Sequence, residues 1–188
     1  MSLVIPLETA RFLPALRPAG HRWPGAAARL VFPLLLLLVA ACGGDRAAGQ
    51  APDFQVTRFD GGEFQLSARA GRSPVVLNFW YPTCPPCRAE MPALEKAWQQ
   101  LRDEEVQFLG MFVPQGFDSE QDAKDFIEEL ELTYAFATDK GGRIARSYEL
   151  EYFPTTLFVD RSGRIFKRHV ATLGEEGIVR IVREMAQN

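Results

Sequence analysis

Apolar residues recur along most of the chain with two spacings, one typical of strands and one typical of helices. The run Val75–Tyr81 is almost continuously apolar, which indicates a strand that is buried on both faces. Apolar residues at helical spacing, Leu94, Trp98 and Leu101, follow it and predict a helix that begins soon after the strand ends. A second, mostly buried strand is predicted over Glu105–Val113.

The same patterns predict further elements on either side of this pair. Apolar and polar residues alternate on both sides of Asp60–Gly62, which predicts a hairpin. After the second buried strand, the pattern predicts a helix capped by Ser119 and Asp122, a short strand over 134–137 and a short helix after Gly142. Paired strands over 153–160 and 164–170 and a closing amphipathic helix over 178–185 are predicted to follow. Strands and helices that alternate in this way predict a single α/β domain.

The first 41 residues differ from the rest. They contain four arginines against one acid, Glu8, and end in an apolar run of twelve residues, Leu30–Ala41. Such a run is too short for a membrane-spanning helix, which needs about 20 residues. A basic region, a short apolar core and small residues at its end are typical of a signal peptide, so residues 1–41 are predicted to be one.

The end of this region, Leu38–Cys42, resembles a bacterial lipobox. The resemblance implies cleavage before Cys42 and a lipid on its thiol, which would anchor the protein to the cell membrane, facing the periplasm or the cell exterior. An uncleaved anchor and a plain signal peptide are the alternatives. Residues 42–52 are small, polar and glycine-rich, and predict a flexible tether to a folded domain over 53–188.

Charge and cysteine content narrow the function classes. The formal net charge of the 188 residues is −3, and residues 1–41 hold four of the basic groups. Once residues 1–41 are set aside, the rest of the sequence has no basic patch interleaved with aromatic residues, so nucleic acid is not an expected partner. Three cysteines leave one unpaired in an exported protein, but a lipid on Cys42 would leave Cys84 and Cys87 as a pair.

This pair stands where the buried strand gives way to the helix. Cys84 falls at the N-cap, Pro85 and Pro86 at the first two helical positions, and Cys87 at the third. Because proline has no N–H, the Cys87 amide is the backbone donor nearest to a Cys84 thiolate, which also faces the positive end of the helix. Such thiolates have pKa values of about 3.5–7.5 instead of ~8.5. We expect Cys84 to be a redox nucleophile and Cys87 its resolving thiol, with no bound cofactor.

The pair has two other interpretations. A zinc site would need further soft ligands, and the sequence offers only Cys42, His21 and His169. A purely structural disulfide is the second alternative, but a bridge that closes so short a loop adds little stability.

Three stretches, Leu77–Trp80, Cys84–Pro92 and Phe153–Thr156, resemble the thioredoxin superfamily, and in particular its extracytoplasmic TlpA/ResA-like thiol–disulfide oxidoreductases. The similarity runs from about Asp53 to the C-terminus. It implies a thioredoxin-like fold, with a central mixed sheet flanked by helices and an N-terminal β-hairpin.

The resemblance also implies roles for two polar residues. Asn78 occupies the position of a buried aspartate that helps to deprotonate the resolving thiol in cytoplasmic thioredoxins, and we expect it to be a core amide. Proton exchange is then expected to fall to Glu90, because ResA-like proteins have a carboxylate there and a desolvated carboxylate titrates closer to neutrality. The alternative for Glu90 is a solvated residue on the helix face.

Three further residues are expected to form the substrate site. By resemblance, the Phe153–Pro154 bond is cis, Pro154 lies against the dithiol, and the backbone at Phe153 pairs with the substrate chain. Thr83 stands just before Cys84, where the TlpA-like branch usually has tryptophan, so this departure bears on the choice of substrate.

These observations predict a membrane-tethered reductant of disulfides in exported proteins, re-reduced by a membrane thiol carrier. The oxidised Cys-x-x-Cys-His segment of apocytochrome c is the client that the resemblance implies. A general disulfide oxidant or isomerase would share the motif. A copper chaperone of the Sco type would need His169, and a thiol peroxidase would need a cysteine loop of a different kind.

Overall fold

The computed structural model describes residues 49–187. The predicted signal peptide over 1–41 and the predicted lipidation site, Cys42, lie outside the described residues. Within residues 49–187, no helix is long and apolar enough to cross a membrane.

Five strands form the central sheet in the order β5-β4-β3-β6-β7. Their bounds are β3 Val75–Trp80, β4 Gln107–Phe112, β5 Ala135–Thr138, β6 Thr155–Val159 and β7 Ile165–Val170. The first three run parallel to one another, whereas β6 is antiparallel to β3 and β7 to β6. The sheet is therefore mixed, as predicted. The predicted hairpin is also present, as β1 Gln55–Thr57 paired with β2 Glu63–Gln65.

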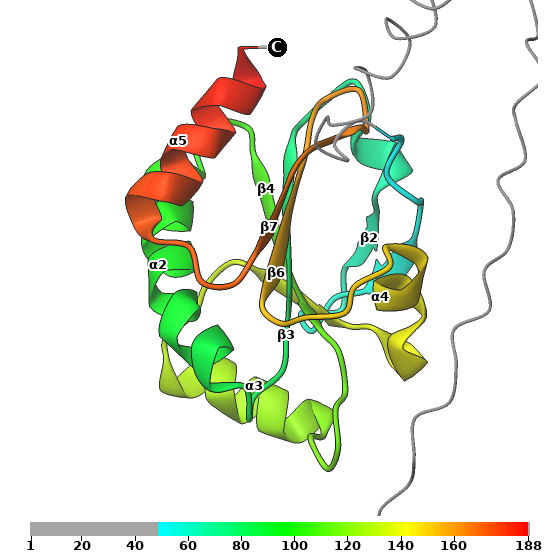
Figure 1. Cartoon of the computed structure of the whole chain (residues 1–188), viewed down its shortest axis with the longest axis vertical. Helices are drawn as coiled ribbons and strands as arrows, with labels where there is room; N and C mark the ends of the chain where they lie inside the picture. The colour runs from blue at the N-terminus through cyan, green and yellow to red at the C-terminus, as the bar shows by residue number, and fades with distance from the viewer. Residues whose placement is uncertain (1–48, 188) are drawn as a thin grey trace, which may run out of the picture. The chain divides into compact units, whose positions relative to one another are not determined.

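The longer helices cover one face of this sheet, and the hairpin and a short helix cover the other (Figure 1). The helices are α2 Pro85–Leu101, α3 Glu120–Glu129, α4 Arg143–Ser147 and α5 Glu175–Ala186, with 3-10 turns η1 Ser67–Arg69 and η2 Lys140–Gly142. Figure 1 shows α2, α3 and α5 together on one side and β2 with α4 on the other. The architecture confirms the predicted α/β class.

Every residue of β3 is buried, because its alternating side chains enter two separate cores. Val76 and Trp80 join the core beneath α2, α3 and α5. Leu77 and Phe79 join the core beneath the hairpin and α4. The continuous apolar run in the sequence thus reflects a central strand with a layer on each side.

The register of the sheet brings two distant stretches to the same end. Phe79, near the end of β3, is paired with Thr155, the first residue of β6. Two segments therefore lie together at one end of these strands: the segment that leads from β3 to Cys84, and the Phe153–Pro154 bond that precedes β6.

The last part of the predicted tether is not free of the domain. Gln50 forms a β-bridge with Arg164, and the amide of Ala51 donates to the carbonyl of Gly163 at 2.9 Å. The Ile165 amide likewise donates to the Gly49 carbonyl at 3.1 Å. Residues 49–52 therefore belong to the folded domain, and the boundary predicted at Asp53 was too late.

Candidate active site

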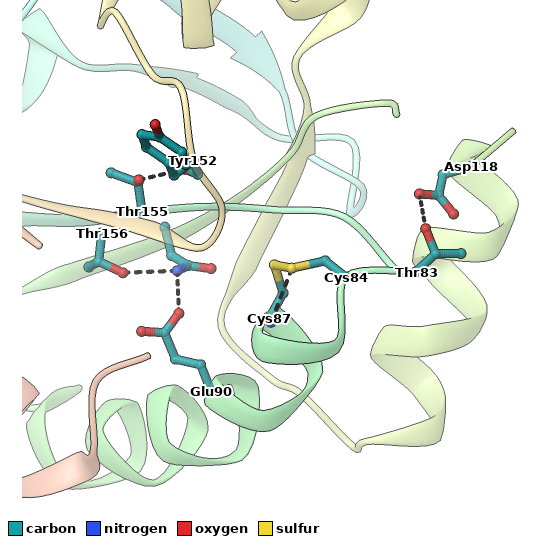
Figure 2. Close-up of a disulfide and its surroundings, with 9 residues drawn as sticks. Thr83, Cys84, Cys87, Glu90, Asp118, Tyr152, Thr155 and Thr156 are labelled. Carbon is teal, nitrogen blue, oxygen red and sulfur yellow. Dashed lines mark hydrogen bonds between the residues drawn. A yellow bond between two sulfur atoms is a disulfide. The ribbon is translucent and has the colours of Figure 1, made fainter. Parts of the chain in front are cut away.

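The two cysteines of the motif form a disulfide at the start of α2 (Figure 2), with an S–S length of 2.03 Å. Cys84 is the N-cap in an extended conformation, and prolines fill the first two helical positions. The Cys87 amide donates to the Cys84 sulfur at 3.2 Å. These features confirm the local geometry predicted from the sequence.

The turn into the helix is held by two backbone hydrogen bonds. The Cys84 amide donates to the Tyr81 carbonyl at 3.2 Å, and the Arg88 amide donates to the Cys84 carbonyl at 3.0 Å. With two prolines between the cysteines, the Cys87 N–H is the one backbone donor that this turn offers to a thiolate on Cys84. The positive end of the helix dipole also stabilises a thiolate on Cys84.

Glu90 lies one helical turn after Cys87, on the buried face of α2, and is only 2% exposed. Its Oε1 accepts from the Leu173 amide at 3.0 Å, and its Oε2 accepts from the Asn78 side chain at 2.9 Å. Burial raises the pKa of Glu90 to about 7, although both hydrogen bonds oppose the rise. The alternative of a solvated glutamate on the helix face is therefore wrong.

Asn78 is a core amide, as expected, but it also belongs to the surroundings of Glu90. It is 1% exposed, and its Nδ2 donates to both Glu90 Oε2 and Thr156 Oγ1, each at 2.9 Å. Nδ2 thus bridges the two side chains that are labelled Glu90 and Thr156 in Figure 2. Asn78 therefore ties the carboxylate on α2 to the strand that follows Pro154.

The Phe153–Pro154 peptide bond is cis, as the resemblance implied. Pro154 is buried and its carbonyl accepts from the Ala171 amide at 3.0 Å. The Phe153 ring packs edge-to-face on Tyr81, with 5.4 Å between the ring centroids, and against the core cluster that contains both cysteines. The predicted substrate residues Phe153 and Pro154 thus lie beside the segment that carries Cys84.

Thr83 directly precedes the nucleophile. Its hydroxyl donates to Asp118 Oδ2 at 2.8 Å, which joins the turn before Cys84 to the loop before α3 (Figure 2). A groove of about 700 Å³ opens there, and its lining includes Thr83, Asp118 and the fully exposed ring of Phe117. Thr83 is therefore exposed at the surface.

Three residues of this site escaped prediction. Thr156 and Leu173 bond to the Asn78–Glu90 pair, and Asp118 bonds to Thr83. Thr156 ends the Phe153–Thr156 stretch that carries the family resemblance, but nothing in that stretch pointed to a bond with Asn78. No local pattern marks Leu173 or Asp118. The Ser119 capping box was the nearest signal, since it placed the start of α3 next to Asp118.

Within residues 49–187, no group of three or more potential metal ligands comes together. The His169 ring nitrogen Nε2 lies 3.3 Å from the Thr172 carbonyl. His169 therefore has a partner in its own chain, at the end of β7.

Comparisons with known proteins agree with this site. Residues 47–168 match the model of the AhpC/TSA family. The thiol-disulfide oxidoreductase ResA of Bacillus thuringiensis subsp. konkukian is 29% identical over 118 residues, which are 63% of this chain and 66% of ResA, just under two thirds. The thioredoxin-like protein YneN of Bacillus subtilis is 35% identical over 124 residues, which are 66% of this chain and 71% of YneN.

A solved structure extends the agreement to the fold. A Chlorobium tepidum protein described as a thiol:disulfide interchange protein DsbE superposes with a TM-score of 0.67 and 25% identity, over 74% of this chain and 96% of that one. The predicted resemblance to ResA-like, thioredoxin-fold proteins is confirmed, and the chain belongs to the AhpC/TSA family of thioredoxin-like proteins.

Proposed function

We propose that this protein is a thiol–disulfide oxidoreductase that reduces disulfides in exported proteins while anchored to the outside of the cell membrane. The observation that carries the proposal is the Cys84–Cys87 disulfide at a helix N-terminus, with the Cys87 N–H aimed at the Cys84 sulfur. The names of the ResA relatives support the same chemistry.

In the reaction, the Cys84 thiolate attacks one sulfur of a client disulfide and releases the other as a thiolate. The mixed disulfide is then resolved when Cys87, after losing its proton, attacks the Cys84 sulfur. The client gains two electrons and two protons, and the protein is left with the Cys84–Cys87 disulfide. A membrane thiol carrier would return two electrons to this disulfide.

Glu90 is the group that would exchange the Cys87 proton. It lies three residues further along the same helix, so the two side chains are neighbours. A carboxyl group whose pKa is about 7 can accept and release a proton at neutral pH. Loss of Glu90 would therefore change the pH dependence of thiol reactivity, without removing the sulfur chemistry.

The client would bind across the site, between Phe153 and Pro154 on one side and Thr83 on the other. The resemblance to ResA-like proteins supports the oxidised Cys-x-x-Cys-His segment of apocytochrome c as one such client. A synthetic peptide with that disulfide can be mixed with the reduced protein, and the rate of reduction measured. A rate no greater than that of insulin, a disulfide protein of unrelated sequence, would argue against cytochrome c as a preferred client.

The direction of electron flow is tested by the reduction potential of the pair against glutathione. Known thioredoxin-fold proteins range from about −270 mV to −120 mV, from reductants to oxidants. A value near the reducing end is expected. A value near the oxidising end would favour the alternative, a general disulfide oxidant or isomerase.

The membrane anchor is tested separately from the chemistry. Export of the full chain in bacteria grown with a radiolabelled fatty acid should label the protein, and Cys42→Ser should abolish the label. Label that persists in Cys42→Ser would rule out lipid on this thiol. Unlabelled wild-type protein would leave the plain signal peptide or the uncleaved anchor, which differ in the mass of the mature N-terminus.

A further inference from the structure

The two polar atoms of the Asn78 side chain differ in their hydrogen bonds: one makes two, and the other makes none. Its Nδ2 donates to Glu90 and to Thr156, while its Oδ1 is buried without a hydrogen-bond partner. A buried acceptor without a donor is unfavourable, and such atoms are uncommon in native proteins. The arrangement calls for a reason to keep an asparagine at this position of β3.

Each of the two hydrogen bonds that Glu90 accepts suits its ionised state. Oε1 faces the Leu173 amide and Oε2 faces the Asn78 Nδ2, and both of these groups are donors. A proton placed along either of these two hydrogen bonds would point at another hydrogen. The Leu173 donor belongs to the backbone and cannot become an acceptor, so only the Asn78 side chain can change to receive it.

A half-turn of the Asn78 amide provides that change. The turn exchanges Nδ2 and Oδ1, which have nearly the same size and opposite hydrogen-bonding character. Oδ1 then accepts a hydrogen bond from the protonated Oε2 of Glu90. The Thr156 hydroxyl, which accepts from Nδ2 in the ionised state, can donate to Oδ1 in the protonated state, because a hydroxyl does either.

We infer that the Asn78 side-chain amide turns over each time Glu90 gains or loses its proton, which makes Asn78 the positioning residue of proton exchange beside the dithiol. The inference rests on the proposed role of Glu90 in exchanging the Cys87 proton. It would explain why an amide works here where a carboxylate or an apolar residue would not: only the amide presents a donor to one charge state and an acceptor to the other.

Other titratable groups lie around Glu90. The dithiol lies on the same helix, and its cysteines do not titrate while they are bonded to each other. Tyr134 has its pKa raised well above 10 by burial and by the charge of Glu90, and its hydroxyl donates to the Met91 sulfur. His169 on β7 is paired in register with Thr156, so it is the one neighbour that needs a control variant.

The first test follows the amide directly, in the oxidised protein labelled with ¹³C and ¹⁵N. The Glu90 carboxyl carbon and the Asn78 side-chain NH₂ are recorded by NMR from pH 5 to 9. The expected result is one shared midpoint, with the NH₂ protons losing their proximity to Glu90 at low pH. An NH₂ signal that does not move with the carboxyl carbon would overturn the inference.

Two variants sharpen this test. In Glu90→Gln the side-chain NH₂ mimics the proton, so the Asn78 amide should stay turned over at every pH. In His169→Gln the shared midpoint should persist. A shift of the Asn78 amide that survives in Glu90→Gln, or disappears in His169→Gln, would assign the movement to another group and overturn the inference.

The second test concerns function and uses the pH dependence of the alkylation rate of the reduced dithiol. Asn78→Leu removes both the donor and the acceptor with little change in volume. Because the lost hydrogen bond to the carboxylate is about twice as strong as the lost bond to the neutral carboxyl group, the midpoint of the Glu90-dependent step should rise by about half to one pH unit, a threefold to tenfold change. Thr156→Val keeps the amide and should give a smaller rise. A normal profile in Asn78→Leu would overturn the inference.

The two proposals fail in different ways. If Glu90→Gln has the wild-type alkylation profile, Glu90 does not exchange the thiol proton, and the proposed role of Glu90 is wrong. If Glu90→Gln changes the profile and Asn78→Leu does not, the role of Glu90 stands and that of Asn78 is wrong.

Discussion

The amide of Leu173 donates a 3.0 Å hydrogen bond to Glu90 Oε1, which ties the loop between β7 and α5 to the helix that carries the cysteines. The bond compensates only part of the cost of burying this carboxylate, since the pKa of Glu90 is still raised from 4.5 to about 7. The position therefore lowers stability when Glu90 is ionised. A residue that is costly to the fold and lies one turn from a reactive cysteine is more readily explained by function than by packing.

The first prediction is that Glu90→Gln removes a pH dependence of folding stability. Between pH 4.5 and about 7, the folded state binds more protons at Glu90 than the unfolded state, so the free energy of unfolding falls as pH rises through this window. At 1.36 kcal/mol per pKa unit, the fall amounts to roughly 3 kcal/mol. Urea denaturation of the oxidised protein at pH 5 and pH 8 measures it.

The matched control for this prediction is Glu128→Gln, a change to an exposed glutamate on α3. This variant should keep the wild-type difference between pH 5 and pH 8, whereas Glu90→Gln should lose most of it. An equal difference in Glu90→Gln and wild type would mean that Glu90 titrates normally in the folded state.

The second prediction concerns Gly110 in β4, behind the active site. A Cβ at this position would overlap the Phe136 ring and would lie 3.2 Å from Trp80 Nε1. Both rings are buried and cannot move away freely. Gly110→Ala should lower the free energy of unfolding by about 1–3 kcal/mol, as overpacking of a core does. Gly49→Ala, which has open space around its Cβ, should change it by less than about 0.5 kcal/mol. Equal stability of the two variants would contradict the crowding at β4.

Sequence patterns predicted those parts of the site that are local. The strand, the proline-containing turn and the N-cap of Cys84 follow from neighbouring residues, because each is fixed by backbone geometry over a few positions. The cis bond before Pro154 was predicted only through the family resemblance, since nothing in the local composition requires it.

The surroundings of Glu90 were not predictable in the same way. The sequence shows that Glu90 shares a helix face with Cys87 and Leu94, but a face that is partly apolar can still meet solvent. The two hydrogen-bond donors of Glu90 are Leu173, in the loop before α5, and Asn78, whose amide the sheet register also brings to Thr156. Such contacts between distant residues become visible only in the folded structure.

The third prediction assigns the order of attack between the two cysteines. Because Cys84 accepts the Cys87 N–H and lies at the helix N-terminus, its thiolate should form first. Cys87→Ser should therefore accumulate a mixed disulfide with an oxidised client, and Cys84→Ser should not. Mass spectrometry under non-reducing conditions detects the adduct, and both variants should lose catalytic turnover. Accumulation of the adduct in Cys84→Ser instead would reverse the roles of nucleophile and resolving thiol.

The fourth prediction tests whether Thr83 acts in client docking. Its hydroxyl holds Asp118 at 2.8 Å on an exposed surface, so Thr83→Val should change the free energy of unfolding by less than about 0.5 kcal/mol. The groove beside Cys84 should nevertheless change shape, and the KM for a protein disulfide should rise about twofold to fivefold, which corresponds to less than about 1 kcal/mol of binding. The rate with a small aromatic disulfide, which needs no groove, should stay the same. Ser147→Ala, on α4 across the sheet, is the control and should affect neither substrate. If Thr83→Val slows both substrates equally, the residue acts on the reactivity of Cys84, and the groove is not where the client binds.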